Sequence, residues 1–519
     1  MTGPTESPTS RPQAAACSPK RGVPGAGFAL TVLVLAVLLV AIDATVLGLA
    51  TPFLSEDLRL SGTQLLWIGD IYSFVIAGLL VSMGSLGDRI GRKKLLLTGA
   101  VAFGAVSVLN AYATSPEMMI AARALLGVGR AATLMPSTLA LIRNIFHDPK
   151  ERTFAIGIWG AMASAGAAVG PVVGGFLLEH FWWGSVFLIN LPVMAVLVLV
   201  GIKLLPESRD PSPGPWDLPS VALSMIGIVA VVFAIKEGAA NGLHWYVLLA
   251  AAVGALALVW FVRRQLTLPS PLLNMRLFHH RGFSGPVLAD LLTILGLSGL
   301  VFFLSQFLQL VQDRDPLEAG SRTCRPPSAV TAGLLAGKVA RRYSVRSVVA
   351  GGLGAIGLSL AVLVWLHADT AYPILGAVLL LVGVGAGFSF TVTADVILSS
   401  VPKEQAGAAS AVSETAYELG AALGIALLGS VVTGVYSDFA TPEGVPPAAA
   451  TEAHESLGGA VEMAADLPAD TGGALLASAQ DAFVDGLQIA SGVGAVVLLA
   501  TAVAAWFLLR GQRLEGGGH

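Results

Sequence analysis

Long apolar stretches of about 20 residues recur along the whole chain, and they constrain its fold more than any other feature. A helix of this length crosses the hydrocarbon core of a bilayer, where only helices and closed barrels satisfy all their backbone hydrogen bonds. The 519 residues are 55% hydrophobic and only 12% charged, with a mean hydropathy of +0.77, which is typical of a multi-pass membrane protein. We therefore predict an all-α integral membrane protein. The fourteen predicted spans are residues 27–51, 66–87, 95–113, 118–141, 153–178, 184–204, 217–236, 243–262, 284–310, 326–340, 347–366, 371–398, 406–434 and 486–509.

Lysine and arginine are concentrated in alternate predicted loops, which tests the spans independently. Of the 30 such residues, 23 lie in the two terminal tails and in the loops that follow even-numbered spans. Because loops rich in Lys and Arg stay in the cytoplasm, we expect both termini to be cytoplasmic. Arg123 and Arg130 are exceptions, since they fall inside the fourth predicted span.

Three segments lie outside the spans. Residues 1–26 are rich in Pro, Ser, Gly and Ala, and we expect a disordered cytoplasmic tail there, with a second cytoplasmic tail at 510–519. Residues 435–485 contain Asp and Glu but no Lys or Arg. This composition predicts an external loop that is poor in helix and is not a folded domain.

The sequence also argues against several function classes. A net charge of −3, without a basic run, predicts no nucleic-acid partner. Cys17 and Cys324 do not form a CxxC pair and no His cluster has metal-ligand spacing, so we expect neither a disulfide nor a metal site. There is no G-x-x-x-x-G-K-S/T loop for ATP and no cluster of nucleophile and base. We therefore expect no cofactor and no enzymatic activity, in a monomer surrounded by lipid.

The loop after the second span combines turn glycines, an acid at a helix end and a basic cluster. It reads GSLGDRIGRKK at residues 84–94, and a partly matching repeat, GKVARRY, follows the tenth span at 337–343. This element resembles the loop signature of the major facilitator superfamily. The resemblance implies that the loop locks one conformation of a transporter. Its expected gating residues are Gly84, Asp88, Arg89, Gly91 and Arg92.

The same resemblance implies a fold of two six-helix bundles. Residues 27–204 and 284–509 would form the bundles, and residues 205–283 would supply two inserted spans. This arrangement is similar to that of the fourteen-span drug:proton antiporters of the QacA/EmrB-like family.

A glycine-rich stretch in the fifth span is similar to the antiporter motif of that family. Gly166, Gly170 and Gly174 recur at every fourth residue, so they clear one helix face for the close approach of another helix. Pro171 removes a backbone hydrogen bond from the same helix, and Gly175 completes the motif. The resemblance implies export of a substrate and not its uptake.

Five acids fall well inside predicted spans, where a charge costs roughly 2.5–3.5 kcal/mol on insertion scales. An acid that holds either a proton or a cation, but not both, couples the two fluxes. Asp43 is the expected proton carrier, and Arg123 is its expected cationic partner. Arg123 lies in a stretch that is similar to the family's fourth-span element. The alternative is that Asp43 and Arg123 form a static buried ion pair. The five acids are Asp43, Asp70, Asp290, Glu414 and Glu418.

Glu414 and Glu418 are four residues apart, so they share one face of a helix. The resemblance implies that this pair binds cationic substrates, and the alternative is a solvated pair near a helix end. Asp70 matches a family position near the outer end of the second span, in an expected vestibule. Asp290 and Asp395 lie near the cytoplasmic ends of their spans, so we expect them to snorkel or to cap a helix.

The sequence departs from the family pattern at three places. Leu126 replaces an amide, and Arg130 stands where a small residue is expected, which favours an anionic or polar substrate. Residues 318–329 make an unusually polar entry to the tenth span, either because the external loop extends inward or because the recorded sequence contains an error.

The predicted function is the proton-coupled export of antibiotics or lipophilic drug-like compounds across the cytoplasmic membrane. An exporter of an endogenous metabolite is the alternative with the same fold. A polytopic sensor or scaffold is the alternative from another class, and it would not need the paired carboxylates or the glycine face.

Overall fold

The computed structural model describes residues 25–58, 60, 62–133, 135–209, 217–269, 271–313, 326–402 and 405–510. Throughout these ranges the regular elements are helices and no strand occurs, which confirms the all-α prediction. Most of the two predicted tails, and most of the polar stretch at 318–329, lie outside the described residues.

Eight helices form the first half of the molecule. The sharp turn between α2 and α3 is made by Gly91, whose φ of 111° suits a residue without a Cβ atom. Asp148 begins α6, because its carboxylate accepts a hydrogen bond from the Lys150 amide at 2.6 Å. The helices are α1 (Ala26–Leu58), α2 (Gly62–Ile90), α3 (Arg92–Ala111), α4 (Pro116–Thr133), α5 (Met135–Ile145), α6 (Pro149–His180), α7 (Ser185–Leu188) and α8 (Asn190–Leu204).

Two helices connect the halves, and the second half follows. The connecting helices are α9 (Leu218–Asn241) and α10 (Trp245–Thr267), followed by the short η1 (Met275–His279). The second half contains α11 (Arg281–Gln306) with its π-helical end η2 (Phe307–Val311), α13 (Pro326–Tyr343), α14 (Val345–Leu363), α15 (Tyr372–Ser399), α16 (Ala406–Tyr436), α17 (Pro447–Glu455), α18 (Leu457–Asp466) and α19 (Ala469–Leu508).

The helix surfaces are those of a membrane protein. Among the described residues, eleven helical segments are long and apolar enough to cross a bilayer. Large apolar side chains cover their outer faces, for example Leu256 at 70% exposed, Trp260 at 66% and Phe507 at 62%. An apolar surface of this extent requires a lipid environment. The helices α4, α6 and α13 pack among these segments, against α2, α1 and α15 respectively.

The prediction that residues 435–485 are poor in helix was wrong, because this segment is largely helical. It contains α17, α18 and the first turns of α19. Leu457 and Leu475 are buried there, and the Tyr436 hydroxyl donates to the Ala453 carbonyl at 2.7 Å. Alanine, which is frequent in this segment, is the best helix former, and packing against its neighbours completes the burial.

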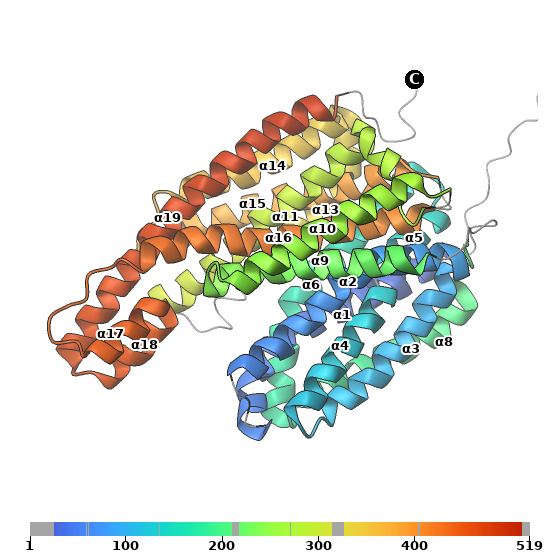
Figure 1. The fold of residues 1–519 in the computed structure, drawn as a ribbon. Helices are drawn as coiled ribbons and strands as arrows, with labels where there is room; N and C mark the ends of the chain where they lie inside the picture. Colours follow the sequence, from blue (N-terminus) through green and yellow to red (C-terminus); the bar gives the residue numbers. More distant parts are fainter. Residues whose placement is uncertain are drawn as a thin grey trace, which may run out of the picture.

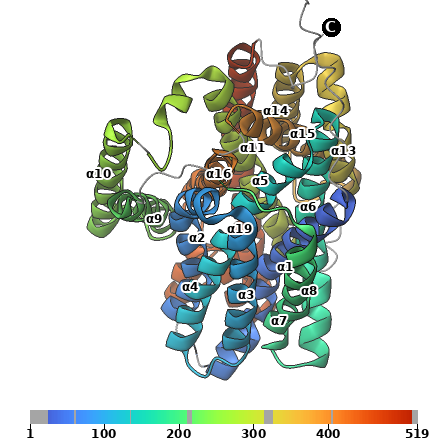
Figure 2. The same cartoon turned by 90° about the vertical axis from the view of Figure 1, so that its right-hand side faces the viewer.

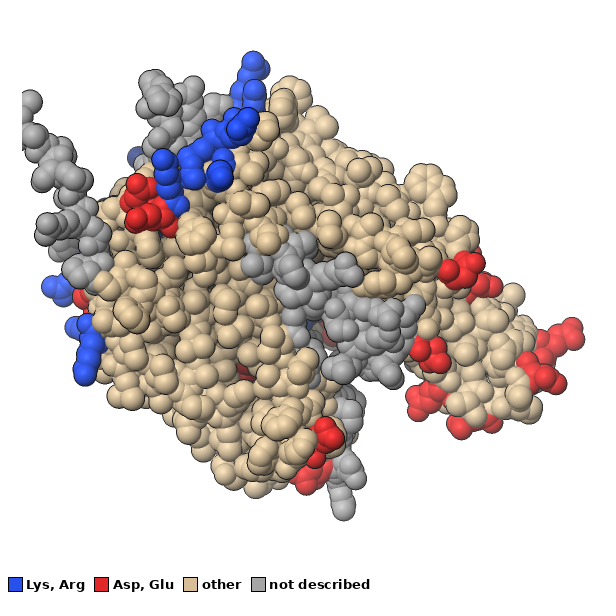
Figure 3. Space-filling view, turned by 180° about the vertical axis from the view of Figure 1, so that it is seen from behind, with Lys and Arg blue, Asp and Glu red and all other residues tan. Residues whose placement is uncertain are grey.

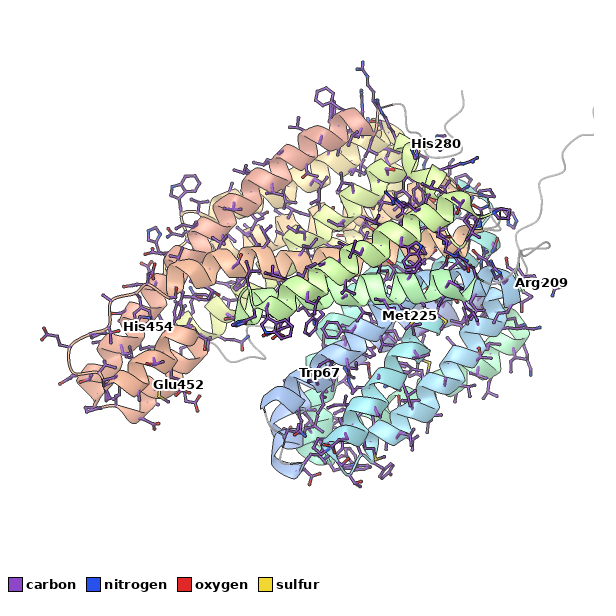
Figure 4. All side chains as sticks on the ribbon, in the orientation of Figure 1. Trp67, Arg209, Met225, His280, Glu452 and His454 are labelled. Atoms are coloured by element: carbon purple, nitrogen blue, oxygen red, sulfur yellow. The ribbon has the colours of Figure 1, made fainter. Side chains whose placement is uncertain are left out.

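Charged side chains mark two opposite ends of the molecule (Figure 3). Lys and Arg gather at the end where the chain terminates, and Figure 4 places Arg209 and His280 there. Glu452 and His454 lie at the opposite end, on the projecting α17. These are called the basic end and the acidic end below.

The two halves lie close together at the basic end, and their ribbons diverge toward the acidic end (Figure 1). The connecting helices α9 and α10 stand outside both halves (Figure 2). Helix α9 packs against α2 of the first half and α16 of the second. Phe74 and Val81 of α2 contribute to one buried cluster with Ile228 and Val232 of α9.

Candidate functional site

Asp43 lies in α1 at a point where four helices of the first half meet. Its side chain is only 4% exposed. The Asn190 amide of α8 donates to one carboxylate oxygen at 2.8 Å, and the Tyr72 hydroxyl of α2 donates to the other at 3.4 Å. Asn190 also donates to the Ser107 hydroxyl of α3 at 3.2 Å. The donors of both hydrogen bonds to Asp43 are therefore neutral side chains.

Arg123 lies close to Asp43 but does not form an ion pair with it in the described part of the chain. Its Nε donates to the Ile68 carbonyl at 3.3 Å, and its guanidinium carbon lies 4.4 Å from the centre of the Tyr72 ring. Its Nη1 is buried without a hydrogen-bond partner among the described residues. The two residues predicted to act together thus meet through Tyr72.

Glu414 and Glu418 lie on one face of α16, directed toward the first half. Glu414 is 3% exposed, and the side chain of Glu418 is 19% exposed. Arg130 of α4 approaches Glu418, with 3.9 Å between Nη2 and Oε1. The other terminal nitrogen of Arg130 donates to the Tyr72 hydroxyl at 3.3 Å. Asp43, Tyr72, Arg130 and Glu418 therefore form a polar chain that runs from one half of the molecule to the other.

Three aromatic rings, which we call the aromatic wall, run from the buried Trp159 in the first half to Tyr417 of α16. Trp159 of α6 stacks on Phe390 of α15, with ring centres 6.0 Å apart and planes tilted by 7°. Phe390 meets Tyr417 of α16 edge to face at 6.3 Å. Tyr417 belongs to the same stretch of α16 as Glu414 and Glu418, and the charges of both glutamates act on its hydroxyl, so the Tyr417 end of the wall lies near the carboxylates. Such a combination suits a flat organic cation.

Asp290 does not snorkel or cap a helix as predicted. It is fully buried where α11, α15 and α16 meet, and it accepts hydrogen bonds from the hydroxyls of Ser413 at 2.8 Å and Thr393 at 3.4 Å. The prediction placed Asp290 at the end of the membrane, but nine residues of α11 precede it. Ser413 is adjacent to Glu414 in α16, so the hydrogen bond from its hydroxyl ties Asp290 to the same turn of that helix.

The predicted gating loop joins the two halves at the basic end. Asp88 accepts hydrogen bonds from the amides of Gly407 and Ala408, both at 3.1 Å, so it caps the N-terminus of α16. Arg92 holds the same carboxylate at 2.6 Å. A Cβ atom on Gly84 would lie 2.6 Å from the Gly407 carbonyl, so glycine permits the close contact between α2 and α16.

The loop is also tied to the end of the first half. Glu207 accepts from the Lys93 amide at 3.2 Å, and the Ser208 hydroxyl accepts from Arg92 at 3.1 Å. A Cβ atom on Gly91 would lie 2.5 Å from the Glu207 carboxylate. Arg89 is partly buried at the end of α2.

Asp395 forms a second junction between the halves and does not snorkel as predicted. It is fully buried in α15. The Arg152 guanidinium of α6 lies 2.6 Å from one of its oxygens, and the Thr153 hydroxyl donates to the other at 2.6 Å. We call these three residues the latch. Nearby, Arg143 of α5 donates to the Val401 carbonyl of the second half.

The predicted glycine face of α6 packs against α1. Added Cβ atoms on Gly166 and Gly174 would lie 2.5 Å from the Leu38 carbonyl and 2.9 Å from Val46, and one on Gly170 would collide with the Thr45 hydroxyl. Gly175 is different, because no atom of the described structure lies within 4 Å of an added Cβ. The Pro171 side chain lies outside the described residues.

Two further predictions cannot be placed. The side chain of Asp70 lies outside the described residues, although its backbone belongs to α2, and Cys324 lies outside them entirely. In the part of the chain that the structure describes, no group of three His, Cys, Asp or Glu side chains is placed to hold a metal ion.

Several residues of the site carried no recognised signal in the sequence. Asn190 is 147 residues from Asp43, and Arg152 is 243 residues from Asp395. Asparagine is frequent in loops, and Arg152 falls in the basic loop predicted before the fifth span. An amide directly after an apolar run, and a basic residue directly before one, were the available signals.

Curated relatives cover almost the whole chain. It is 48% identical over 482 residues to the multidrug efflux pump LfrA of Mycolicibacterium smegmatis, which spans 92% of this chain and 95% of that protein. It is 38% identical over 490 residues to the methyl viologen resistance protein SmvA of Salmonella typhimurium, with 93% and 98% covered. It is 33% identical over 488 residues to the puromycin resistance protein pur8 of Streptomyces alboniger, with 93% and 91% covered.

Solved structures show the same fold. The human organic anion transporter MFSD10 matches with a TM-score of 0.61 at 15% identity, over 93% of this chain and 99% of that chain. A bacterial homologue of the human lysosomal transporter Spinster matches with a TM-score of 0.56 at 18% identity, over 95% and 99%. At these identities the likeness concerns the fold alone. Residues 33–425 match the family described as Major Facilitator Superfamily, and together with the 48% identical relative this shows that the chain belongs to that superfamily.

Proposed function

We propose that this protein is a proton-coupled antiporter that exports lipophilic, cationic, aromatic drugs across the cytoplasmic membrane. The relatives named for multidrug efflux and for methyl viologen and puromycin resistance support drug export. The observation that carries the proposal is the polar chain, because it joins a buried acid of the first half to acids beside an aromatic wall in the second half. We further propose that the chain crosses the membrane fourteen times, in the arrangement of the QacA/EmrB-like family.

The orientation in the membrane follows from the charges. We place the basic end in the cytoplasm, together with both termini, because Lys and Arg gather there (Figure 3). The halves are then joined on the cytoplasmic side by Asp88 and by the latch, and they diverge toward the outside (Figure 1). Because the halves are joined at the cytoplasmic end and apart at the other end, we assign this conformation as outward-facing.

The transport cycle uses the two sets of acids in turn. Cargo enters from the cytoplasm when the latch and the gating loop separate, and its cation binds at Glu414 and Glu418 against the aromatic wall. Proton binding at Asp43 from the outside follows the release of cargo. One proton moving inward across 100 mV gains about 2.3 kcal/mol, and the outward movement of one monovalent cation uses the same amount. The pH difference, or each proton beyond the first, therefore drives the accumulation, and a further proton at 100 mV supports roughly a 50-fold concentration ratio.

The first test uses everted membrane vesicles and ethidium, a flat aromatic cation. We expect ethidium to accumulate in energised vesicles that contain the protein and to leave them when a protonophore is added, because the proton gradient is the only driving force. Vesicles without the protein are the control. Accumulation that persists after the protonophore would contradict proton coupling.

The second test replaces Glu414 with glutamine. A cation loses a charge-assisted contact worth about 1.5–3 kcal/mol, so we expect the half-saturating concentration of ethidium to rise by roughly 10- to 100-fold. Export of the neutral antibiotic chloramphenicol should change little. The matched control is Glu452→Gln on the exposed α17. An equal loss for both compounds would remove Glu414 from cation recognition.

A further inference from the structure

Arg130 is a cation placed inside a site that the proposed function assigns to cations. Its guanidinium comes from α4 of the first half and lies 3.9 Å from the carboxylate of Glu418 on α16 of the second half. Both side chains are partly accessible, at 13% and 19%. Neither the gating loop nor the helix packing described above requires a positive charge at this position.

We propose that Arg130 is a specificity-determining residue, a tethered cation that occupies Glu418 until cargo displaces it. The inference rests on the proposed function and deepens it. A cargo cation must compete with the guanidinium for Glu418. Arg130 therefore sets the minimum affinity that a cation needs in order to bind at this site.

The geometry of the contact between Arg130 and Glu418 suits an ion pair that another cation can displace. The 3.9 Å distance is long for an ion pair, and the hydrogen bond of Arg130 goes to the Tyr72 hydroxyl at 3.3 Å. The latch provides a comparison within the same molecule, since Arg152 and Asp395 are 2.6 Å apart and almost fully buried. The ion pair that closes the basic end is therefore short and buried, and the contact between Arg130 and Glu418 is long and partly accessible.

The Tyr72 ring can hold the Arg130 guanidinium after cargo has displaced it from Glu418. Its guanidinium carbon lies 5.3 Å from the centre of the Tyr72 ring, so the ring continues to hold the cation when cargo takes Glu418. Tyr72 in turn donates to Asp43. The residue that yields to cargo is thus held by the same side chain that contacts the expected proton carrier.

This arrangement defines a class of preferred cargo. Glu414 lies one helical turn from Glu418, and the Tyr417 end of the aromatic wall lies near both. A cargo with an extended aromatic surface gains stacking energy in addition to its charge, so it overcomes the competition from Arg130. A small monocation without aromatic surface does not. The site therefore selects aromatic cations of large area or double charge.

The test is a double-mutant cycle on purified protein in nanodiscs. Ethidium binding is measured by fluorescence anisotropy for the wild type, Arg130→Met, Glu418→Gln and the double variant, and transport is measured in vesicles. Arg130→Met keeps much of the side-chain volume but removes the competing charge. We expect it to lower the dissociation constant of ethidium about fivefold, the scale of one partly exposed ion pair. In the Glu418→Gln background the same change should have less than a twofold effect.

Arg130→Lys is the companion variant, because it retains the charge and should bind ethidium within about twofold of the wild type. The proposal is overturned if Arg130→Met leaves ethidium binding unchanged or weakens it, or if the tightening persists without Glu418. It is also overturned if Arg130→Met loses only the anionic dye 1-anilinonaphthalene-8-sulfonate, since Arg130 would then bind an anionic group. Failure of the wild type to bind or export either ethidium or methyl viologen is a different result, because it contradicts the proposed function itself.

Discussion

Asp43→Asn is expected to abolish the accumulation of ethidium in energised vesicles, because the proton gradient can no longer drive its uptake, and each proton beyond the first would otherwise support roughly a 50-fold ratio at 100 mV. The amide has nearly the same shape as the carboxyl group but exchanges no proton. It still accepts a hydrogen bond from Asn190 through its oxygen, and its NH2 group can donate to the Tyr72 hydroxyl. The fold of the site should therefore survive, and the coupling should not.

Two readouts separate coupling from folding in this variant. We expect preloaded vesicles to exchange labelled for unlabelled ethidium at a rate near that of the wild type, because exchange requires no net proton movement. Asp438→Asn, at an exposed position near the acidic end, is the matched control and should accumulate ethidium normally. Continued accumulation by Asp43→Asn would show that another group carries the proton.

The polar residues found from the sequence were those that are costly in lipid. Asp43, Glu414, Glu418 and Arg130 interrupt apolar stretches, so a single-sequence reading finds them without knowledge of their neighbours. The four-residue spacing of Glu414 and Glu418 also fixed their common helix face. Hydropathy and helix periodicity are local properties, and they were sufficient for these features.

The partners of those residues were not predictable in the same way. The contact between Asn190 and Asp43, and the latch, depend on how helices far apart in sequence pack together. Asp290 and Asp395 were misread because the distance of an acid from a predicted span end does not reveal whether a neighbouring helix covers it. Tertiary packing determines that Asp290 and Asp395 are buried. It also buries the apolar side chains of the alanine-rich segment between α16 and α19.

The latch gives the second large effect, since Asp395→Asn leaves the buried Arg152 without its carboxylate. Removing one partner of a buried ion pair costs about 3–5 kcal/mol. The cost applies to the conformation in which the halves meet at the basic end. Once the halves separate there, water reaches Arg152 and the cost largely disappears. We therefore expect the equilibrium to shift toward the cytoplasm-open state by roughly 150- to 5,000-fold.

Cysteine accessibility measures this shift. Ser410 is fully buried on α16, one turn after Gly407, so Ser410→Cys should react slowly with a membrane-impermeant maleimide in everted vesicles. Cys17 and Cys324 are replaced by serine in this background. Adding Asp395→Asn should accelerate the reaction strongly, and exchanging the charges with Arg152→Asp and Asp395→Arg should slow it again.

The pair formed by Asp217 and Arg264 is the matched control, because it joins α9 to α10 within the connecting segment and not the two halves. The hydrogen bond from Arg264 lowers the pKa of Asp217 to about 2, so this pair is charged at neutral pH. Asp217→Asn removes an ion pair of the same type without loosening the junction, and the labelling of Ser410→Cys should stay slow. Equal acceleration by both substitutions would show that the latch does not set the conformational equilibrium.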